Sequence, residues 1–524
     1  MAASTRREFL VRVGQGMFVA GVGYGTAIDL GLCGALAEED GPATLSFGRL
    51  DPLVDLMQQS TPDKLMPQAV AMLNKGTPLR DFVAAAALAN ARAFGGEDYV
   101  GFHTLMALSP AYDMAQRLPS QRAALPVLKV LYRNTNRIQE KGGPQAQALR
   151  PIDAGSSEAG AGSAAGAEPL RELIHRRDRG AAERMLAALT QRSADEAFND
   201  LLCTVEEAPE VHRVVLAHRA WDMLALVGQE HALTMLRQSL RYCIRGEESS
   251  SKYFGEARER LAKLLDGHKL LSMKAGERVG DDAWVEQMSQ SLFRATPGQA
   301  ADSVAAALAE GFSPDSVGQA IAVAANQLVL RDAGRREREV QPNKPLGSVH
   351  GDSIGVHACD SAHAWRQIAR VSNHRNTMAA LIMAGYQVAK DRVARGGEFL
   401  EWQPRPYQEN LEKIAAKDPV GLLGELDAAI RDNNQAQACA VAHRYGELGF
   451  AARSIFDALL NYATSEDGAL HAEKFFRTTS DEFAALGPAF RWRQVVALAR
   501  VTASEYGRRA AGYDDACRLL NVPA

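Results

Sequence analysis

The stretch TPDKLMPQAVAMLNKGTPLRDFVAAAALAN, residues 61–90, decides the fold class of this chain. Thr61-Pro62 at its start and Thr77-Pro78 in its middle each place a hydroxyl group before a proline, a common way for an α-helix to begin. Gly76 suits the left-handed position that ends a helix. Apolar residues recur in between at spacings of three and four, so the stretch predicts two consecutive helices.

The same pattern returns in the second half of the chain. Thr296-Pro297 and Ser313-Pro314 repeat the two helix starts, and Gly311 repeats the helix end. Alternating runs of Val, Ile and Thr, which are typical of strands, are almost absent. We therefore predict an all-α protein with a duplicated, pseudo-two-fold arrangement of helical hairpins or bundles.

The predicted domains follow from this repeat and from composition. The first half is residues 45–260, interrupted at 142–168 by a Gly-, Ala- and Ser-rich segment that is typical of a flexible linker. The second half is residues 285–480, and residues 481–524 are a helical C-terminal extension. With 524 residues, the chain exceeds the size at which one core keeps growing.

Charge and cysteine content exclude several classes of protein. The 59 basic and 63 acidic residues give a net charge of −4, and there is no long basic run, so a nucleic-acid partner is not expected. The six cysteines show no CxxC spacing, which argues against a zinc ribbon or a disulfide framework.

The N-terminus has the features of an export signal. Ser4-Thr5-Arg6-Arg7-Glu8-Phe9-Leu10 resembles the twin-arginine motif, and a weakly apolar segment follows it. Ala35-Leu36-Ala37 is a small-x-small cleavage site. We predict a signal peptide at 1–37, engagement of the twin-arginine translocation machinery, and a periplasmic or otherwise exported protein without a stable membrane span. Retention of the segment as an anchor is the alternative.

The chemically densest stretch is Gly355–Arg366, which contains His357, His363 and Arg366. A helix from about Ser361, capped by Asp360 or Ser361, would place His363 and Arg370 on one face, with His357 just before the helix. Gly101-Phe102-His103, earlier in the chain, has the same Gly-apolar-His order as Gly355-Val356-His357. These side chains are the candidates for acid–base chemistry or for holding an anion, and the alternative is that the histidines are structural.

A metal site is a second hypothesis. His218 and His443 lie in similar runs, Leu216-Ala217-His218-Arg219 and Val441-Ala442-His443-Arg444. With His103 and His357 they would make a symmetric set of four imidazoles that could hold a metal ion or a haem. No HExxH or CxxCH motif supports either cofactor. His212 and His231 add imidazoles without adding a pattern, and a nicotinamide cofactor is left open as well.

Two segments resemble a known family. His357-Ala358-Cys359-Asp360-Ser361-Ala362-His363-Ala364-Trp365-Arg366 resembles the His-Ala-Val-Thr-Gly-x-His-Ala-x-Arg motif of questin oxidase-like proteins, and Gly101–Leu108 resembles their Phe-His-x-Leu helix. His357, His363 and Arg366 match that motif, whereas Cys359, Asp360 and Ser361 depart from it. The resemblance implies oxidation of an aromatic substrate, as in the ring opening by fungal members.

The expected function is therefore an exported oxidoreductase of questin oxidase-like type. It would act on a small, aromatic or apolar molecule in a histidine-lined cavity, with His357 as base or ligand, His363 and His103 beside it, and Arg366 or Arg370 holding an anion. The alternative is a non-catalytic helical scaffold or binding protein. An enzyme would need its histidines to converge on one pocket, whereas a scaffold would scatter them.

Overall fold

The computed structural model describes residues 44–152, 166–342 and 344–524, and residues 45–524 form one compact unit. The predicted signal peptide at 1–37 lies outside the described residues. So do residues 153–165, the central part of the predicted linker.

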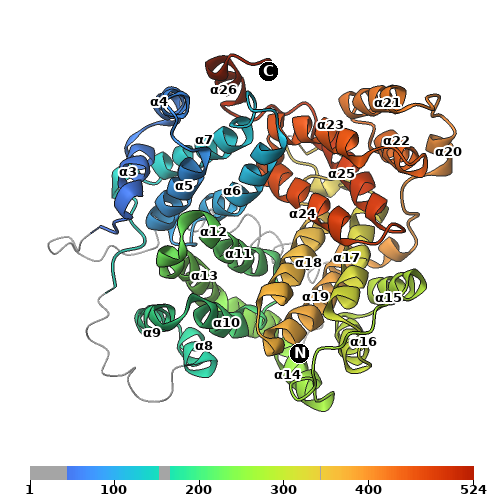
Figure 1. Ribbon diagram of the computed structural model, residues 1–524. Helices are drawn as coiled ribbons and strands as arrows, with labels where there is room; N and C mark the ends of the chain where they lie inside the picture. Colours follow the sequence, from blue (N-terminus) through green and yellow to red (C-terminus); the bar gives the residue numbers. More distant parts are fainter. Residues whose placement is uncertain (1–43, 153–165, 343) are drawn as a thin grey trace, which may run out of the picture. The chain divides into compact units, whose positions relative to one another are not determined.

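The described chain is all-α, as predicted, and no β-strand occurs in these ranges (Figure 1). None of their helices combines the length and the apolar character that crossing a membrane requires. The α-helices are α3 Asp51–Gln59, α4 Pro62–Asn74, α5 Leu79–Phe94, α6 Tyr99–Arg117, α7 Leu125–Glu140, α8 Ala167–His175, α9 Arg179–Arg192, α10 Ala194–Val205, α11 Val211–Asp222, α12 Leu224–Val227, α13 Ala232–Tyr253, α14 Gly255–Gly267, α15 Asp282–Arg294, α16 Pro297–Ala309, α17 Pro314–Arg331, α18 Ile354–Val371, α19 His374–Arg395, α20 Gln408–Leu411, α21 Pro419–Arg431, α22 Gln435–Glu447, α23 Ala452–Ser465, α24 Ala472–Ala485, α25 Arg491–Glu505 and α26 Tyr513–Leu520. Short 3₁₀ helices are η2 Gly48–Leu50, η3 Gly143–Gln145, η5 Gln229–His231, η6 Glu337–Glu339, η7 Gly397–Leu400 and η8 Gly468–Leu470.

Helices begin at or next to all four predicted starts, and the expected hydroxyl caps form at Thr296 and Ser313 but not at Thr61 or Thr77. Thr296 forms a capping box with Gln299, and the Ser313 hydroxyl accepts a hydrogen bond from the backbone N–H of Ser316. Gly76 and Gly311, with φ of +98° and +85°, take the left-handed conformation expected after α4 and α16.

The helices after these starts make corresponding contacts in the two parts of the chain. In the first part, α4 packs on α7, α5 packs on α6 and α7, and α6 packs on α7. In the second part, α16 packs on α19, α17 packs on α18 and α19, and α18 packs on α19. The internal duplication itself stays a prediction. Its proposed limits at 260 and 480 fall inside α14 and α24, so they do not coincide with breaks between helices.

Helix α18 begins earlier than predicted. It starts at Ile354 with Ser353 at the N-cap position, so the expectation of a start near Ser361, capped by Asp360 or Ser361, was wrong. Gly355 is accommodated in the first turn because α18 lies against the backbone of α17 there. A Cβ atom on Gly355 would come within 2.8 Å of the Leu328 backbone. As a consequence, His357 lies in the first turn of the helix rather than before it.

Four helices pack side by side in a closed ring: α6 contacts α11, α11 contacts α18, α18 contacts α24, and α24 contacts α6 (Figure 1). We call these four helices the central bundle. Helices α11 and α18 run in the same direction, because His212 lies beside His357 and, six residues further on, His218 lies beside His363. Helix α24 runs parallel to α18 as well, since His471 lies beside His357 and Glu482 bonds His363.

A buried ion pair ties α7 to α24. The Nζ atom of Lys129 lies 2.6 Å from Oε1 of Glu473, and both side chains are completely buried. The same Nζ donates hydrogen bonds to the backbone oxygens of Ala463 and Glu466, at 2.8 and 2.7 Å. This amino group therefore joins segments more than 300 residues apart in the sequence.

We predict that Lys129→Met lowers the free energy of unfolding by about 3–5 kcal/mol, because it leaves the Glu473 carboxylate buried without its cation. Urea denaturation measures the loss. The double variant Lys129→Met/Glu473→Gln should regain part of it. If the double variant is no more stable than the single one, the ion pair is not the source of the effect.

Candidate functional site

Four histidines converge at one end of the central bundle. They are His103 in α6, His212 in α11, His357 in α18 and His471, the residue just before α24. Going round the ring in this order, neighbouring imidazole centroids lie 4.9, 5.6 and 5.2 Å apart, and His471 closes the ring 5.2 Å from His103. We call these residues the histidine quartet.

The start of each helix places its histidine. Asp98 caps α6 by accepting the N–H of Gly101, and Glu210 caps α11 by accepting the N–H groups of His212 and Arg213. Before α24, residues 468–470 all have positive φ and turn the chain sharply so that His471 faces the bundle. Each imidazole therefore lies within five residues of a helix start.

The imidazole nitrogens have divided roles. In three members of the quartet Nδ1 is held by an oxygen acceptor: His103 by the Tyr99 carbonyl at 2.7 Å, His212 by the Glu210 carboxylate at 2.7 Å, and His471 by the Ala469 carbonyl at 3.0 Å. These contacts assign the proton to Nδ1 and leave the Nε2 lone pair available.

The Nε2 atoms are the unusual feature of the quartet. Those of His103 and His212 are buried and have no hydrogen-bond partner in the described part of the chain. Those of His357 and His471 are hydrogen-bonded to each other at 3.1 Å; because the proton of His471 is on Nδ1, His357 donates and His471 accepts. A buried polar atom normally has a partner, so the Nε2 atoms of His103 and His212 are free to hold a shared ligand, either a metal ion or an internal water molecule.

Two members of the quartet are buried, the other two are partly buried, and three of the four imidazoles are held neutral. His103 and His471 are each 3% exposed. Burial, reinforced by the charge of Lys474, lowers the pKa of His103 and His471 well below the usual value, and burial with the neighbouring His212 lowers the pKa of His357 to about 3. Unprotonated imidazoles are the form that binds metal ions.

Glu210 orients the ring of His212. Burial opposes ionisation of Glu210, but the contacts with His212 and with the backbone N–H groups outweigh it and lower the carboxyl pKa. The hydroxyl of Tyr242 donates a further hydrogen bond to Oε2 at 2.9 Å. Such a carboxylate–histidine pair is the usual second layer around a histidine-bound metal.

The geometry fits a transition-metal ion after a small rearrangement. Two imidazole nitrogens bound to one zinc ion at about 2.0–2.1 Å lie roughly 3.3 Å apart, close to the 3.1 Å between His357 and His471. His103 and His212 would have to turn inward, because no three quartet nitrogens lie within 4.8 Å of one another. Imidazole ligands suit zinc, iron, copper and nickel.

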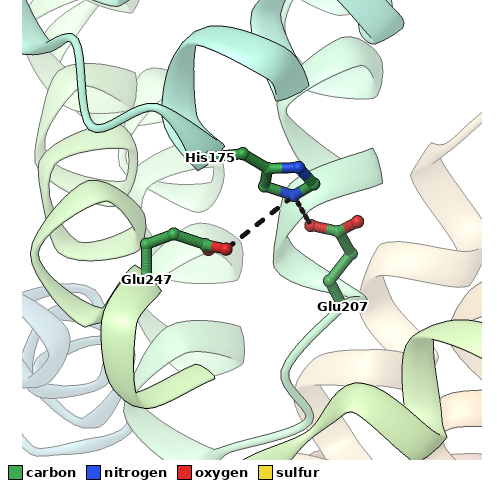
Figure 2. A group of neighbouring side chains, drawn as sticks. All are labelled: His175, Glu207 and Glu247. Carbon is green, nitrogen blue, oxygen red and sulfur yellow. Dashed lines mark hydrogen bonds and ion pairs between the residues drawn. The ribbon is translucent and has the colours of Figure 1, made fainter. Parts of the chain in front are cut away.

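Among the described residues, one group of three ligand atoms is closer together, namely His175, Glu207 and Glu247 (Figure 2). Nε2 of His175 lies 2.7 Å from Glu207 and 3.9 Å from Glu247. Both carboxylates already have cations, since Arg171 bonds Glu207 at 2.5 Å and Arg258 bonds Glu247 at 2.8 Å. We therefore interpret this group as a structural ion-pair network.

The residues expected from the sequence are divided between two places. His103 and His357 belong to the quartet. His363 and Arg366 lie further along α18, where both bond Glu482, and Arg370 pairs with Asp315 at 3.0 Å. Of the residues predicted to converge on one site, only His103 and His357 do so.

The predicted metal ligands also lie elsewhere. His218 packs against His363 with the ring centroids 5.9 Å apart, and His443 pairs with Glu447 on α22. In the structure, His212 and His471 complete the quartet, where His218 and His443 were expected. The sequence held one signal for this pair: His212 follows His103 by 109 residues, and His471 follows His357 by 114.

The loop before α18 lies directly against the quartet. A Cβ atom on Gly351 would come within 2.1 Å of Cβ of His471, so only glycine fits there. The backbone N–H of Gly351 donates to Glu505 at 2.9 Å, and the N–H of Val349 donates to Ser504 at 2.7 Å. This loop is therefore fastened to α25 while it covers His471.

We predict that Gly351→Ala displaces either the loop or His471 and lowers the free energy of unfolding by about 1–3 kcal/mol. Thermal unfolding measures the change. Gly424→Ala is the matched control, because nothing lies within 4 Å of a Cβ atom at that helical position. Equal effects of the two substitutions would contradict the close contact.

The same loop should make stability depend on pH. Burial and the neighbouring Arg508 lower the pKa of His350 to about 3. Between that value and the usual value near 6.5 the unfolded chain binds the extra proton, so stability is lost as the pH falls. We predict that His350→Gln makes the acid-side decline shallower by up to about 1.4 kcal/mol per pH unit in urea titrations. Parallel declines in the two proteins would refute this.

Comparison with known proteins gives no match: no family model, no curated protein and no solved structure matches the chain. The function of the chain is therefore inferred from the chemistry of its own residues.

Proposed function

We propose that this protein is an exported oxidoreductase whose reaction centre is a transition-metal ion held by the histidine quartet. The observation that carries the proposal is the set of four converging imidazoles whose Nε2 atoms either face one another or have no partner in the described chain. A purely structural role would leave the Nε2 atoms of His103 and His212 unpaired, and an unpaired buried polar atom costs about 1–3 kcal/mol. The same observation argues against the alternative, a non-catalytic scaffold.

The surroundings of the quartet support a small aromatic or apolar substrate. The Tyr99 ring lies 4.4 Å from the ring of His103 and 5.8 Å from that of His212, and Tyr99 is 40% exposed. Phe102 stacks on His103 at 4.9 Å. Aromatic surface beside a reaction centre favours a flat apolar ligand.

The group that would stabilise an anion differs from the one first expected. Arg366 and Arg370 are engaged by Glu482 and Asp315. Lys474, one helical turn beyond His471, is buried, and burial lowers the pKa of its amino group to about 8. Its charge also acts on His103, His357 and His471. In this proposal Lys474 takes the role of the anion-stabilising cation.

Oxidation rather than hydrolysis is supported by two considerations. Four imidazoles hold redox-active iron and copper as readily as zinc. The resemblance of residues 101–108 and 357–366 to questin oxidase-like proteins supports the same choice. Export through the twin-arginine pathway rests on the Ser4–Leu10 motif and is part of the proposal, since that route carries proteins that are already folded.

We expect the protein purified from its native compartment to contain about one transition-metal ion per chain, measured by elemental analysis. Each of His103→Ala, His212→Ala, His357→Ala and His471→Ala should remove most of it. Glu210→Gln should weaken metal binding about 10–100-fold without abolishing it, because it disturbs the orientation of His212 only.

His443→Ala is the matched control, because this histidine lies on α22 and pairs with Glu447. It should leave the metal content unchanged. A protein free of metal, with all four quartet variants folded and equally stable, would contradict the proposed centre and favour the scaffold.

A further inference from the structure

The interior of the central bundle is polar for several turns beyond the quartet. On α18, Asp360 and His363 follow His357 at intervals of three residues, so each side chain lies next to the previous one along a stripe that winds round the helix. On α24, Lys474, Thr478 and Glu482 continue from His471 in the same way. All of these residues beyond the quartet are buried. Helices in a soluble protein normally bury apolar stripes, so this polar interior needs another explanation.

The polar side chains join neighbouring helices at successive levels. The Thr478 hydroxyl donates to Oδ1 of Asp360 at 2.8 Å. One turn further, Nδ1 of His363 lies 3.0 Å from Oε1 of Glu482. At the same level the rings of His363 and His218 lie 5.9 Å apart and perpendicular. These groups follow one another along the interior of the bundle, beginning one helical turn beyond the quartet; we call them the column.

Three buried atoms in this column have no hydrogen-bond partner in the described residues. They are Oδ2 of Asp360, Nε2 of His363 and Nδ1 of His218. Buried polar atoms of this kind are usually bridged by internal water molecules. Water molecules between these three atoms would let a proton pass from one group to the next.

The far end of the column approaches solvent. Nε2 of His363 lies 3.5 Å from Oδ2 of Asp481, which is partly exposed and bonds Arg477 at 2.6 Å. Asp222, also partly exposed, accepts a hydrogen bond from Ser109 at 2.5 Å. The charged groups that face the two histidines are Arg219 and Asp222 of α11, Asp360 and Arg366 of α18, and Arg477, Asp481 and Glu482 of α24. Lys474 of α24 interacts with Asp360, so acids and bases balance and the column has no excess charge that would attract a second cation.

The quartet cannot exchange protons by itself. Three of its Nδ1 atoms are committed to oxygen acceptors, and its Nε2 atoms are the metal-binding atoms of the proposed centre. A substrate against Tyr99 would further restrict the contact with solvent. Oxidation reactions take up or release protons, so the centre needs a separate carrier.

We propose that His363 and His218, with Asp360 between them and the quartet, form a proton relay that connects the metal centre to solvent at Asp481 and Asp222. This inference rests on the proposed function, because the relay serves the metal centre. In this proposal the imidazoles of His363 and His218 pass protons along the column, and neither residue is a ligand of the metal.

The test uses the full chain loaded with Co²⁺, whose visible absorption reports the protonation state of its surroundings. After a rapid pH jump in weakly buffered solution, the rate of the absorption change in the unsubstituted protein should equal the rate at which the relay delivers protons to the centre. His363→Gln keeps a hydrogen-bonding group near Glu482 but cannot carry a proton. We expect it to slow the change roughly tenfold or more, with the final spectrum and the bound cobalt unchanged. Free imidazole added to the solution should restore part of the rate, which a purely structural defect would not allow.

His218→Gln is the second variant and should slow the change in the same way if His363→Gln fails to fold. His443→Gln is the control, because it removes the histidine of the other Ala-His-Arg run, which lies outside the column. Cobalt bound with unaltered rates in both relay variants would overturn the relay and leave the metal centre standing. Failure of the unsubstituted protein to bind cobalt would overturn the proposed function and the relay together.

Discussion

The site depends on one constraint, the register of four parallel helices whose facing surfaces are polar. Apolar helix faces can slide or repack at small cost, whereas hydrogen-bonded side chains meet at one register only. The bonds from Thr478 to Asp360, from His363 to Glu482 and from Ser109 to Asp222 each join a different pair of side chains across the central bundle. Because these contacts fix the helices along their length, the four imidazoles at the helix starts arrive at the same level.

The shared direction of these helices also determines the electrostatics of the quartet. Helix starts carry partial positive charge, so four of them together disfavour a protonated imidazole. Burial and Lys474 act in the same sense on His103, His357 and His471. The site thus keeps these three histidines neutral, and the large apolar core around the bundle supplies the stability that their burial costs.

The sequence predicted the fold class because helix starts and ends are local signals. Thr296, Ser313, Gly76 and Gly311 behave as their chemistry requires. His103 and His357 were found because each follows a glycine and an apolar residue in a recognisable motif. His212 and His471 were not, because their contacts with the quartet join residues more than 100 positions apart. His363 and Arg366 belong to the same dense stretch as His357, but a helix of 3.6 residues per turn carries them about 9 Å or more beyond it.

The distribution of the quartet along the chain gives the predicted duplication a chemical meaning. His103 and His212 come from the predicted first half, and His357 and His471 come from the second. Two of the four neighbouring contacts lie within a half, and the other two, from His212 to His357 and from His471 to His103, connect the halves. Neither half holds enough imidazoles for a closed site, since a catalytic metal centre needs at least three protein ligands. If the chain arose from a repeated unit, the proposed metal centre would require the two units to associate, and the polar column between α11, α18 and α24 is the interface that fixes that association.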